Sequence, residues 1–125
     1  MRAVIEPSPS LPRLQRLFRT MLLAREVDRV ERELVQRGLA FFHVSGAGHE
    51  ALAVLADFLT PDDWLHLHYR DKALLLARGL PVEEFFRSLL GQADSHSAGR
   101  QMSAHFSAPH LRVLSMVGPV GNNAL

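Results

Sequence analysis

A helical hydrophobic period runs from Leu11 to Arg37 and constrains the fold more than any other feature of the sequence. It predicts one helix of about 26 residues, roughly 39 Å long at about 1.5 Å per residue. Ser10 is a suitable N-cap, Pro12 is tolerated in a first helical turn, and Gly38 is a suitable stop. The apolar positions form a broad stripe: Leu14, Leu17, Phe18, Met21, Leu22, Val27, Val30, Leu34 and Val35. In a chain of 125 residues, such a helix is expected to pack against more than its own domain.

The opposite face of this helix is predicted to be charged and exposed. Asp28 and Arg32, Arg29 and Glu33, and Glu33 and Arg37 are each spaced i,i+4, where opposite charges are neighbours on a helix surface. We therefore expect these side chains to form solvated ion pairs.

Shorter elements are predicted after the long helix. Apolar periodicity and Gly and Pro positions indicate helices over 46–59, 72–78 and 81–90, short strands over 65–69 and 111–117, and the start of a helix over 122–125. Ser45 is a suitable cap for the helix over 46–59, and residues 60–63 and 118–121 are predicted turns. Residues 92–109 lack apolar periodicity and are predicted to form a loop. The expected fold is mainly α, with four or five helices and one or two short strands, following a flexible tail over 1–10.

Composition argues against several classes of function. The net charge of +1 (14 basic and 13 acidic residues) gives no case for binding nucleic acid or an anionic membrane surface. The absence of cysteine excludes disulfides, thiolate metal sites and cysteine nucleophiles. No apolar run is long enough for a signal peptide or a membrane span, so a cytoplasmic location is expected. Lys72 is the only lysine, and the other basic residues are arginines, which suit carboxylates and phosphates.

The segment from Trp64 to Asp71 ends an alternating apolar and polar run in a cluster of hydrogen-bonding side chains. Tyr69 and Arg70 lie between a predicted strand and a predicted helix, where a guanidinium and backbone N–H groups could bind an anion. The alternative is that Arg70 and Asp71 cap the helix, and these residues considered alone favour capping.

The seven histidines do not form a recognisable metal-binding pattern. His66 and His68 would share one face of a strand, but no regular ligand spacing accompanies them, and His49-Glu50 lacks a histidine at the position that a zincin requires. Capping or hydrogen-bonded core positions are therefore favoured over a metal site. The remaining candidates would be His43, His96, His105 and His110.

Several short motifs become informative through their order along the chain. They are an aromatic residue followed by His43-x-Ser45-x-x-Gly48-His49-Glu50-Ala51, then Pro61-Asp-Asp63, Tyr69-Arg70-Asp71, Ala77-Arg78-Gly79, Gly99-Arg-Gln-Met102-x-x-His105 and Gly118-x-Val120-Gly121. From about Leu14 to Leu125, the chain resembles the N-terminal part of the alpha chain of the thiamine diphosphate-dependent decarboxylating (E-one) component of 2-oxo acid dehydrogenase complexes. The Gly-Arg-Gln-Met run resembles branched-chain members, and Gly-His-Glu resembles chains in which the alpha and beta halves are fused.

This resemblance implies a parent fold of the α/β thiamine diphosphate-binding type, of which residues 11–125 would be the N-terminal portion. Tyr69 and Arg70 match the pair that binds the cofactor diphosphate, a role that suits a phenol and a permanently charged guanidinium. Gly118 and Val120 match the turn whose backbone holds the aminopyrimidine. The implied cofactor is thiamine diphosphate.

The resemblance also implies an activity, the oxidative decarboxylation of a 2-oxo acid with transfer of the acyl group to a lipoyl arm. His43 matches a catalytic histidine near the reactive thiazolium, where an imidazole could orient the oxo acid. His105 matches a histidine in the loop at the site entrance. The implied partners are a beta chain or a further C-terminal part of the same enzyme, the lipoyl acyltransferase component, and a second copy of the chain.

One family motif is missing from the sequence. No Gly-Asp-Gly precedes Asn122-Asn123, so the protein ligands for the Mg²⁺ that accompanies the cofactor in the complete parent are not present here. We therefore expect a fragment, a truncated gene product or one piece of a split protein, inactive alone. The alternatives are a stand-alone helical protein-interaction module derived from the family, and a histidine-rich metal protein.

Overall fold

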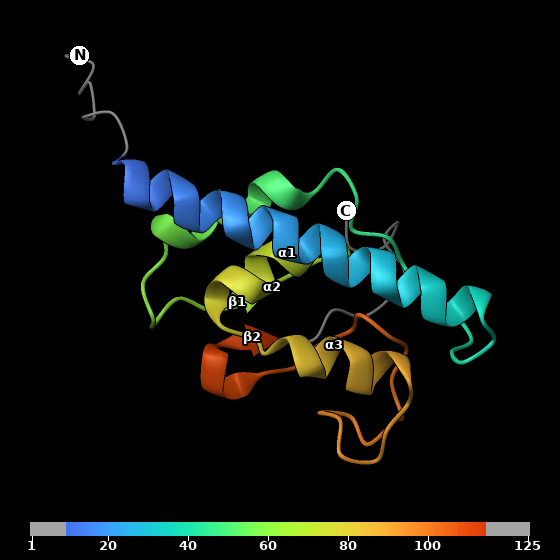
Figure 1. Cartoon of the computed structure of the whole chain (residues 1–125). Coiled ribbons are helices and arrows are strands. Elements are labelled where there is room, and N and C mark those ends of the chain that lie inside the picture. The colour runs from blue at the N-terminus through green and yellow to red at the C-terminus, as the bar shows by residue number, and fades with distance from the viewer. Residues whose placement is uncertain (1–9, 115–125) are drawn as a thin grey trace, which may run out of the picture.

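The predicted long helix is present as α1 (Leu11–Gln36) and is the longest element of the fold. A computed structural model describes residues 10–114. Figure 1 shows α1 running across the molecule, with α2, α3 and the two strands on one side of it. Ser10 is the N-cap residue, and its carbonyl accepts a hydrogen bond from the Leu14 N–H at 3.1 Å. Gly38 follows the helix with φ +72°, which ends it as predicted.

Two further predicted helices are confirmed. α2 (Lys72–Arg78) ends at Gly79, whose φ of +103° favours glycine, and α3 (Val82–Leu89) is slightly shorter than predicted. The predicted helix over 46–59 forms only as the 3-10 helix η1 (Glu50–Asp57). Gly48 has φ +94°, so regular helix begins after it, and the Ser45 hydroxyl binds Asp28 instead of capping η1.

The strands are short and pair in parallel. β1 (Leu65–His66) and β2 (Val113–Leu114) align Leu65 with Val113 and His66 with Leu114. β1 ends early because residues 68–71 form a turn, in which the Asp71 carboxylate accepts the His68 N–H at 2.9 Å. β2 begins only after the short 3-10 helix η2 (Pro109–Leu111). The predicted features over 1–9 and 115–125, including the turn at Gly118 and Val120, lie outside the described residues.

Arg78 connects the two regions that precede β1 and β2. Its guanidinium donates hydrogen bonds of 2.7–3.0 Å to the carbonyls of Thr60, Pro61, Asp63 and Leu111. A single planar side chain with five N–H donors can satisfy all four acceptors. Arg78 therefore holds the 60–63 turn next to η2 and helps to set the register of the strands.

The core lies between α1, α2, α3 and the segment over 104–113. Its main cluster contains Val27, Leu65, Leu75, Leu80, Phe85, Ala104, Phe106, Ala108 and Val113. A smaller cluster contains Ala24, Ala53 and Ala73, one from each of α1, η1 and α2. Alanine side chains allow these three helices to approach closely. Among residues 10–114, no helix has the length and apolarity needed to cross a membrane.

The predicted orientation of α1 is wrong in part. Its buried residues are Leu17, Ala24, Val27, Asp28 and Glu31, whereas Leu14, Phe18 and Leu22 of the predicted apolar stripe are exposed. Asp28 was predicted to lie on the solvated face. It is instead only 2% exposed, because groups from elsewhere in the chain provide hydrogen bonds that compensate its burial.

Candidate functional site

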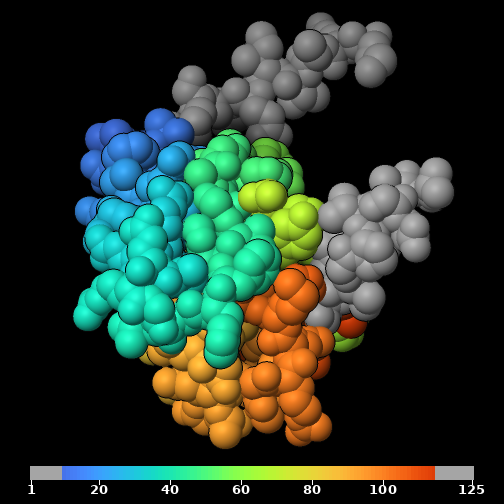
Figure 2. Space-filling view, turned by 90° about the vertical axis from the view of Figure 1, so that its right-hand side faces the viewer, coloured from blue at the N-terminus to red at the C-terminus, as the bar shows by residue number. Residues whose placement is uncertain are grey.

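A pocket of about 380 Å³ lies where three segments of the chain meet. The segments are the connection after α1, the turn between β1 and α2, and the loop after α3. Figure 2 shows the connection, in green and cyan, next to the orange segment around residue 100. The lining residues are Phe42, His43, Val44, Ser45, Tyr69, Arg70, Met102 and His105.

Four residues singled out from the sequence line this one pocket. They are His43, Tyr69, Arg70 and His105, which come from all three segments. Gly118 and Val120 lie outside the described residues. Phe42, Val44, Ser45 and Met102 were not predicted as site residues, although Phe42, Ser45 and Met102 fall within the ordered motifs. Their position in those motifs is the signal that could have identified them.

Arg70 and Tyr69 lie next to each other in the pocket wall. Arg70 Nη1 donates to the Ser45 carbonyl at 2.5 Å, and the guanidinium carbon lies 5.4 Å from the centre of the Tyr69 ring. Tyr69 in turn lies between His68, at 3.8 Å between ring centres, and His105, at 5.8 Å. The pocket therefore presents a permanent cation beside a group of aromatic rings.

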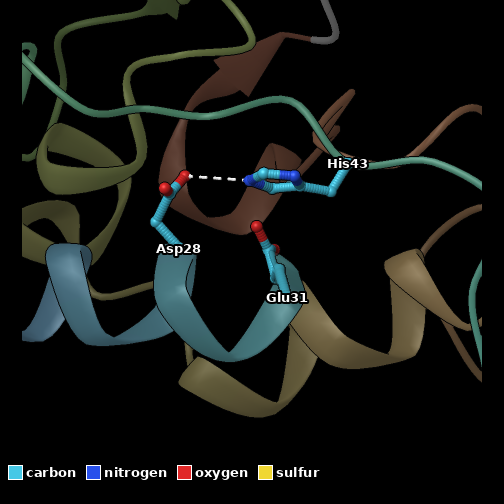
Figure 3. A group of neighbouring side chains, drawn as sticks. All are labelled: Asp28, Glu31 and His43. Atoms are coloured by element: carbon cyan, nitrogen blue, oxygen red, sulfur yellow. Dashed lines mark ion pairs between the residues drawn. The ribbon is translucent and has the colours of Figure 1, made fainter. Parts of the chain in front are cut away.

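His43 points from the pocket wall toward the interior. Its side chain is 12% exposed, and its Nε2 lies 3.4 Å from Asp28 Oδ1 without the alignment of a hydrogen bond. Figure 3 shows the imidazole directed at Asp28 and beside Glu31. Burial lowers the pKa of His43 despite the nearby carboxylate, so the ring is neutral at pH 7. The other ring nitrogen, Nδ1, is therefore the atom of His43 that would contact a molecule in the pocket.

A buried ionic cluster lies behind the pocket. Lys72, Asp28 and Glu31 are 1%, 2% and 3% exposed, and the Lys72 ammonium contacts both carboxylates. Carboxylate and imidazole atoms of Asp28, Glu31 and His43 lie within 4.8 Å of one another, a spacing that could hold a metal ion. The Lys72 ammonium lies against the same carboxylates and supplies the positive charge there.

The two buried carboxylates differ in their proton affinity. Burial by itself raises the pKa of Asp28, but the Gly46 N–H, the Ser45 hydroxyl and Lys72 outweigh it and lower the pKa to about 2. For Glu31, burial is the larger effect and raises the pKa despite Lys72. Of the two carboxylates, Asp28 is thus the one that binds a proton less readily and stays ionised.

Comparison with known proteins establishes the family. The family model described as Dehydrogenase E1 component matches residues 18–125. The chain belongs to this family. It is 36% identical over 107 residues to the 2-oxoisovalerate dehydrogenase subunit alpha of Bacillus subtilis, covering 83% of this chain and 32% of that protein.

Alpha subunits of mitochondrial relatives are also similar to this chain. Identity is 29% over 106 residues to 2-oxoisovalerate dehydrogenase subunit alpha 1 of Arabidopsis thaliana, covering 84% of this chain and 22% of the relative. Identity is 28% over 122 residues to the human alpha subunit, covering 94% and 27%. The predicted resemblance to branched-chain alpha chains is confirmed, since 2-oxoisovalerate is a branched-chain 2-oxo acid. The chain spans about 22–32% of the length of these three relatives.

The chemistry of the pocket fits a diphosphate but not its metal ion. A guanidinium and a phenol line it, and both can donate hydrogen bonds to phosphate oxygens, whereas the Ser45 hydroxyl in the same lining already donates to Asp28. Among the described residues that line the pocket, none carries a carboxylate, the usual protein ligand of Mg²⁺. The volume lies within the roughly 300–1,000 Å³ typical of small-molecule sites.

Proposed function

We propose that this chain supplies the diphosphate-binding part of a thiamine diphosphate site in a 2-oxo acid dehydrogenase. The observation that carries the proposal is the convergence of His43, Tyr69, Arg70 and His105 on one pocket from three separate segments. The names of the relatives favour 2-oxoisovalerate or a similar branched 2-oxo acid as substrate.

Arg70 and Tyr69 would hold the diphosphate. The guanidinium keeps its charge at all physiological pH values, and its fork geometry matches phosphate oxygens. The Tyr69 phenol would add a neutral donor beside it. When bound, thiamine diphosphate would supply the carbanion chemistry that removes CO₂ from a 2-oxo acid, while the protein positions the reactants.

His43 would orient the substrate. Its low pKa keeps it neutral, so it can contact the substrate through Nδ1 without adding charge to the pocket. His105, near the Tyr69 ring, would line the entrance. These roles are proposed for the complete protein, in which Gly118 and Val120 would contact the aminopyrimidine.

The complete site would need other polypeptide. A further C-terminal portion would supply the Mg²⁺ ligands, a beta chain would supply another part of the site, and the lipoyl acyltransferase component would receive the acyl group. Alone, the chain would be inactive. A cytoplasmic location stays a prediction.

Titration calorimetry with inorganic pyrophosphate tests the site. We expect weak binding that falls roughly tenfold or more in Arg70→Met, because a hydrogen bond to a charged group contributes about 1.5–3 kcal/mol. Arg100→Met, at an exposed arginine of the loop after α3, is the matched control and should bind like the unmodified chain. Equal affinities of the two variants would overturn the assignment of Arg70.

Titration with Mg²⁺ and thiamine diphosphate tests whether the site is partial. We expect no tight binding, because the chain lacks the Mg²⁺ motif. Micromolar affinity of the 125-residue chain alone would contradict this part of the proposal.

A second candidate function is a stand-alone interaction module. It is favoured by exposed apolar side chains on α1, including Leu11 and Phe18, which are 68% and 61% exposed. Light scattering combined with the cofactor titration separates the two functions. A stable oligomer that ignores both pyrophosphate and thiamine diphosphate would favour the module.

A further inference from the structure

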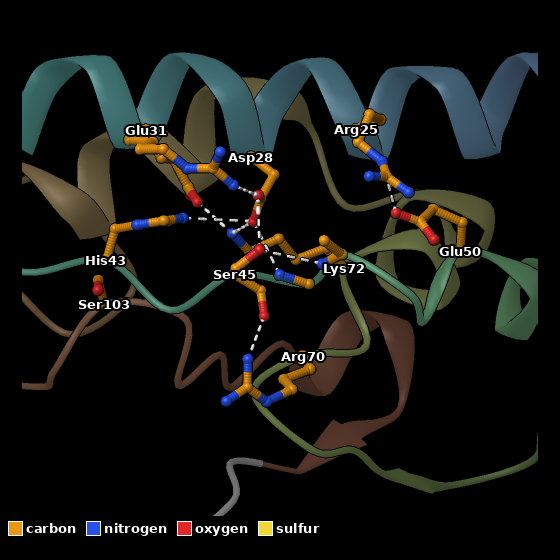
Figure 4. A network of polar contacts seen from close by, with 12 residues as sticks. Arg25, Asp28, Glu31, His43, Ser45, Glu50, Arg70, Lys72 and Ser103 are labelled. Carbon is orange, nitrogen blue, oxygen red and sulfur yellow. Dashed lines mark hydrogen bonds and ion pairs between the residues drawn. The ribbon is translucent and has the colours of Figure 1, made fainter.

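The buried ionic cluster is connected to Arg70 through the backbone of residues 45–46. Asp28 accepts hydrogen bonds from the Ser45 hydroxyl at 2.8 Å and the Gly46 N–H at 2.7 Å, and from Lys72 at 3.1 Å. The Ser45 carbonyl accepts the hydrogen bond from Arg70. Since Lys72 is only two residues from Arg70, these contacts form a closed ring, which Figure 4 shows from α1 to Arg70.

Close backbone packing reinforces this ring. A Cβ atom at Gly46 would lie 2.9 Å from the Arg70 carbonyl oxygen and 3.4 Å from Lys72 Cδ. The first of these distances is too short for a real side chain, so only glycine fits without movement. The connection after α1 is thus pressed directly against residues 70–72.

The two cationic side chains of this ring, Lys72 and Arg70, have different partners. Lys72, the only lysine in the chain, is paired with the buried carboxylates Asp28 and Glu31. Arg70 is hydrogen bonded to a neutral carbonyl, which orients the guanidinium without neutralising it. An arginine held in this way remains a cation for an anionic ligand, whereas an arginine paired with Asp28 would not.

We propose that Asp28, Ser45 and Lys72 are positioning residues that hold the Arg70 guanidinium ready for a diphosphate. This inference rests on the proposed function for the identity of the ligand. Asp28 fixes the Ser45–Gly46 segment, Lys72 balances the charge of Asp28, and the Ser45 carbonyl aims Arg70. A side chain that is ordered before binding loses less rotamer freedom when the ligand binds. The protein therefore binds the ligand with higher affinity.

Two measurements on three serine variants of the 125-residue chain test the proposal. Ser45→Ala removes the hydroxyl that binds Asp28, Ser45→Thr retains a hydroxyl, and Ser103→Ala is the matched control. Ser103 also bonds to the connection after α1, at the Phe42 carbonyl, but has no contact in the ring. The measurements are pyrophosphate affinity by calorimetry and the order of the Arg70 Nε–H group by ¹⁵N NMR without ligand. The Arg70 signal is assigned by its loss in Arg70→Lys.

We expect Ser45→Ala to weaken pyrophosphate binding roughly 3- to 10-fold, the effect of one lost hydrogen bond, and to disorder Arg70 Nε–H. Ser45→Thr should restore both readouts, and Ser103→Ala should leave both unchanged. Asp28→Asn, which keeps the side-chain shape, should act in the same direction as Ser45→Ala and provides the test if Ser45→Ala does not fold.

The two proposals fail in different ways. If the unmodified chain does not bind pyrophosphate, the proposed function fails, and the NMR measurement still decides whether the ring orders Arg70. If Arg70 Nε–H is equally ordered in the unmodified chain and in both Ser45→Ala and Asp28→Asn, the positioning role is overturned. An equal loss of affinity in Ser103→Ala would also overturn it, because the effect would then not depend on the ring.

Discussion

The two halves of α1 contrast in what they bury. In the first half, Leu11, Leu14, Phe18 and Leu22 are apolar yet 45–68% exposed. In the second half, Asp28 and Glu31 are charged yet at most 3% exposed. Residue type alone therefore does not decide which side of this helix faces the core.

The difference follows from what each half meets. Lys72, Ser45 and Gly46 provide the charge and the hydrogen bonds that make burial of Asp28 possible. Leu11 and Phe18 remain largely uncovered within the described residues. The buried groups in the second half thus find their partners within this chain. The exposed apolar side chains of the first half fit the proposal that further polypeptide covers them.

Replacing the buried cation should have the largest effect. Lys72→Met leaves Asp28 and Glu31 buried without their positive partner, which is expected to cost about 3–5 kcal/mol of unfolding free energy. Urea denaturation followed by circular dichroism measures this. Arg29→Met, on the exposed face of the same half of α1, is the control and should show no measurable change. Similar losses in both variants would remove the contrast between buried and exposed charges.

The second half of α1 should also be sensitive to acid. Because the pKa of Asp28 is lowered to about 2 in the folded chain, its ionised form stabilises the fold above pH 4, and this contribution disappears as the pH falls toward 2. The expected loss is about 2 kcal/mol, taking about 1.4 kcal/mol per pH unit. Unfolding free energies of the unmodified chain and Asp28→Asn should therefore converge over this range. A constant difference would contradict the assignment.

His43 should produce a smaller pH dependence in a different range. Its folded pKa lies below the ordinary value of 6.5 because of burial, so its contribution is present above that value and is lost as the pH falls through the folded pKa. His43→Gln should flatten the stability profile between about pH 7 and 5, where an ordinary histidine titrates. The profile of the unmodified chain over the same range is the reference, and equal slopes in the two chains would contradict this assignment to His43.

The first half of α1 should show the smallest effect on stability. Phe18→Ser is expected to change the unfolding free energy by no more than about 0.5 kcal/mol, as is usual for exposed sites. Self-association measured by light scattering should decrease if this face binds apolar partners. The neighbouring Leu17→Ser, at a buried position, should instead cost about 2 kcal/mol or more. A large loss in Phe18→Ser would show that the first half is already packed.

Much of the secondary structure could be predicted because its signals are local. The stop at Gly38 and the Pro at the start identify α1, and Gly79 marks the end of α2. The late start and 3-10 winding of η1 could not be predicted from its apolar residues, because a turn through Gly48 and close packing of Ala53 decide it.

The candidate site was predicted in part. The ordered motifs singled out His43, Tyr69, Arg70 and His105, and the fold brings them to one pocket. The role of Ser45 was missed because its hydroxyl was interpreted as a helix cap. It contacts Asp28, which is 17 residues away, and no local pattern reports that distance.

The sequence by itself determined the family, the long helix and four of the residues that line the pocket, because the order of motifs and the hydrophobic period are properties of the chain. Only the tertiary structure decided that Asp28 and Glu31 lie inside. An i,i+4 pair with arginine looks the same on a solvated face as on a buried one, and the difference is made by Lys72, 44 residues from Asp28 and 41 from Glu31. Burial of a charge depends on partners that folding brings together.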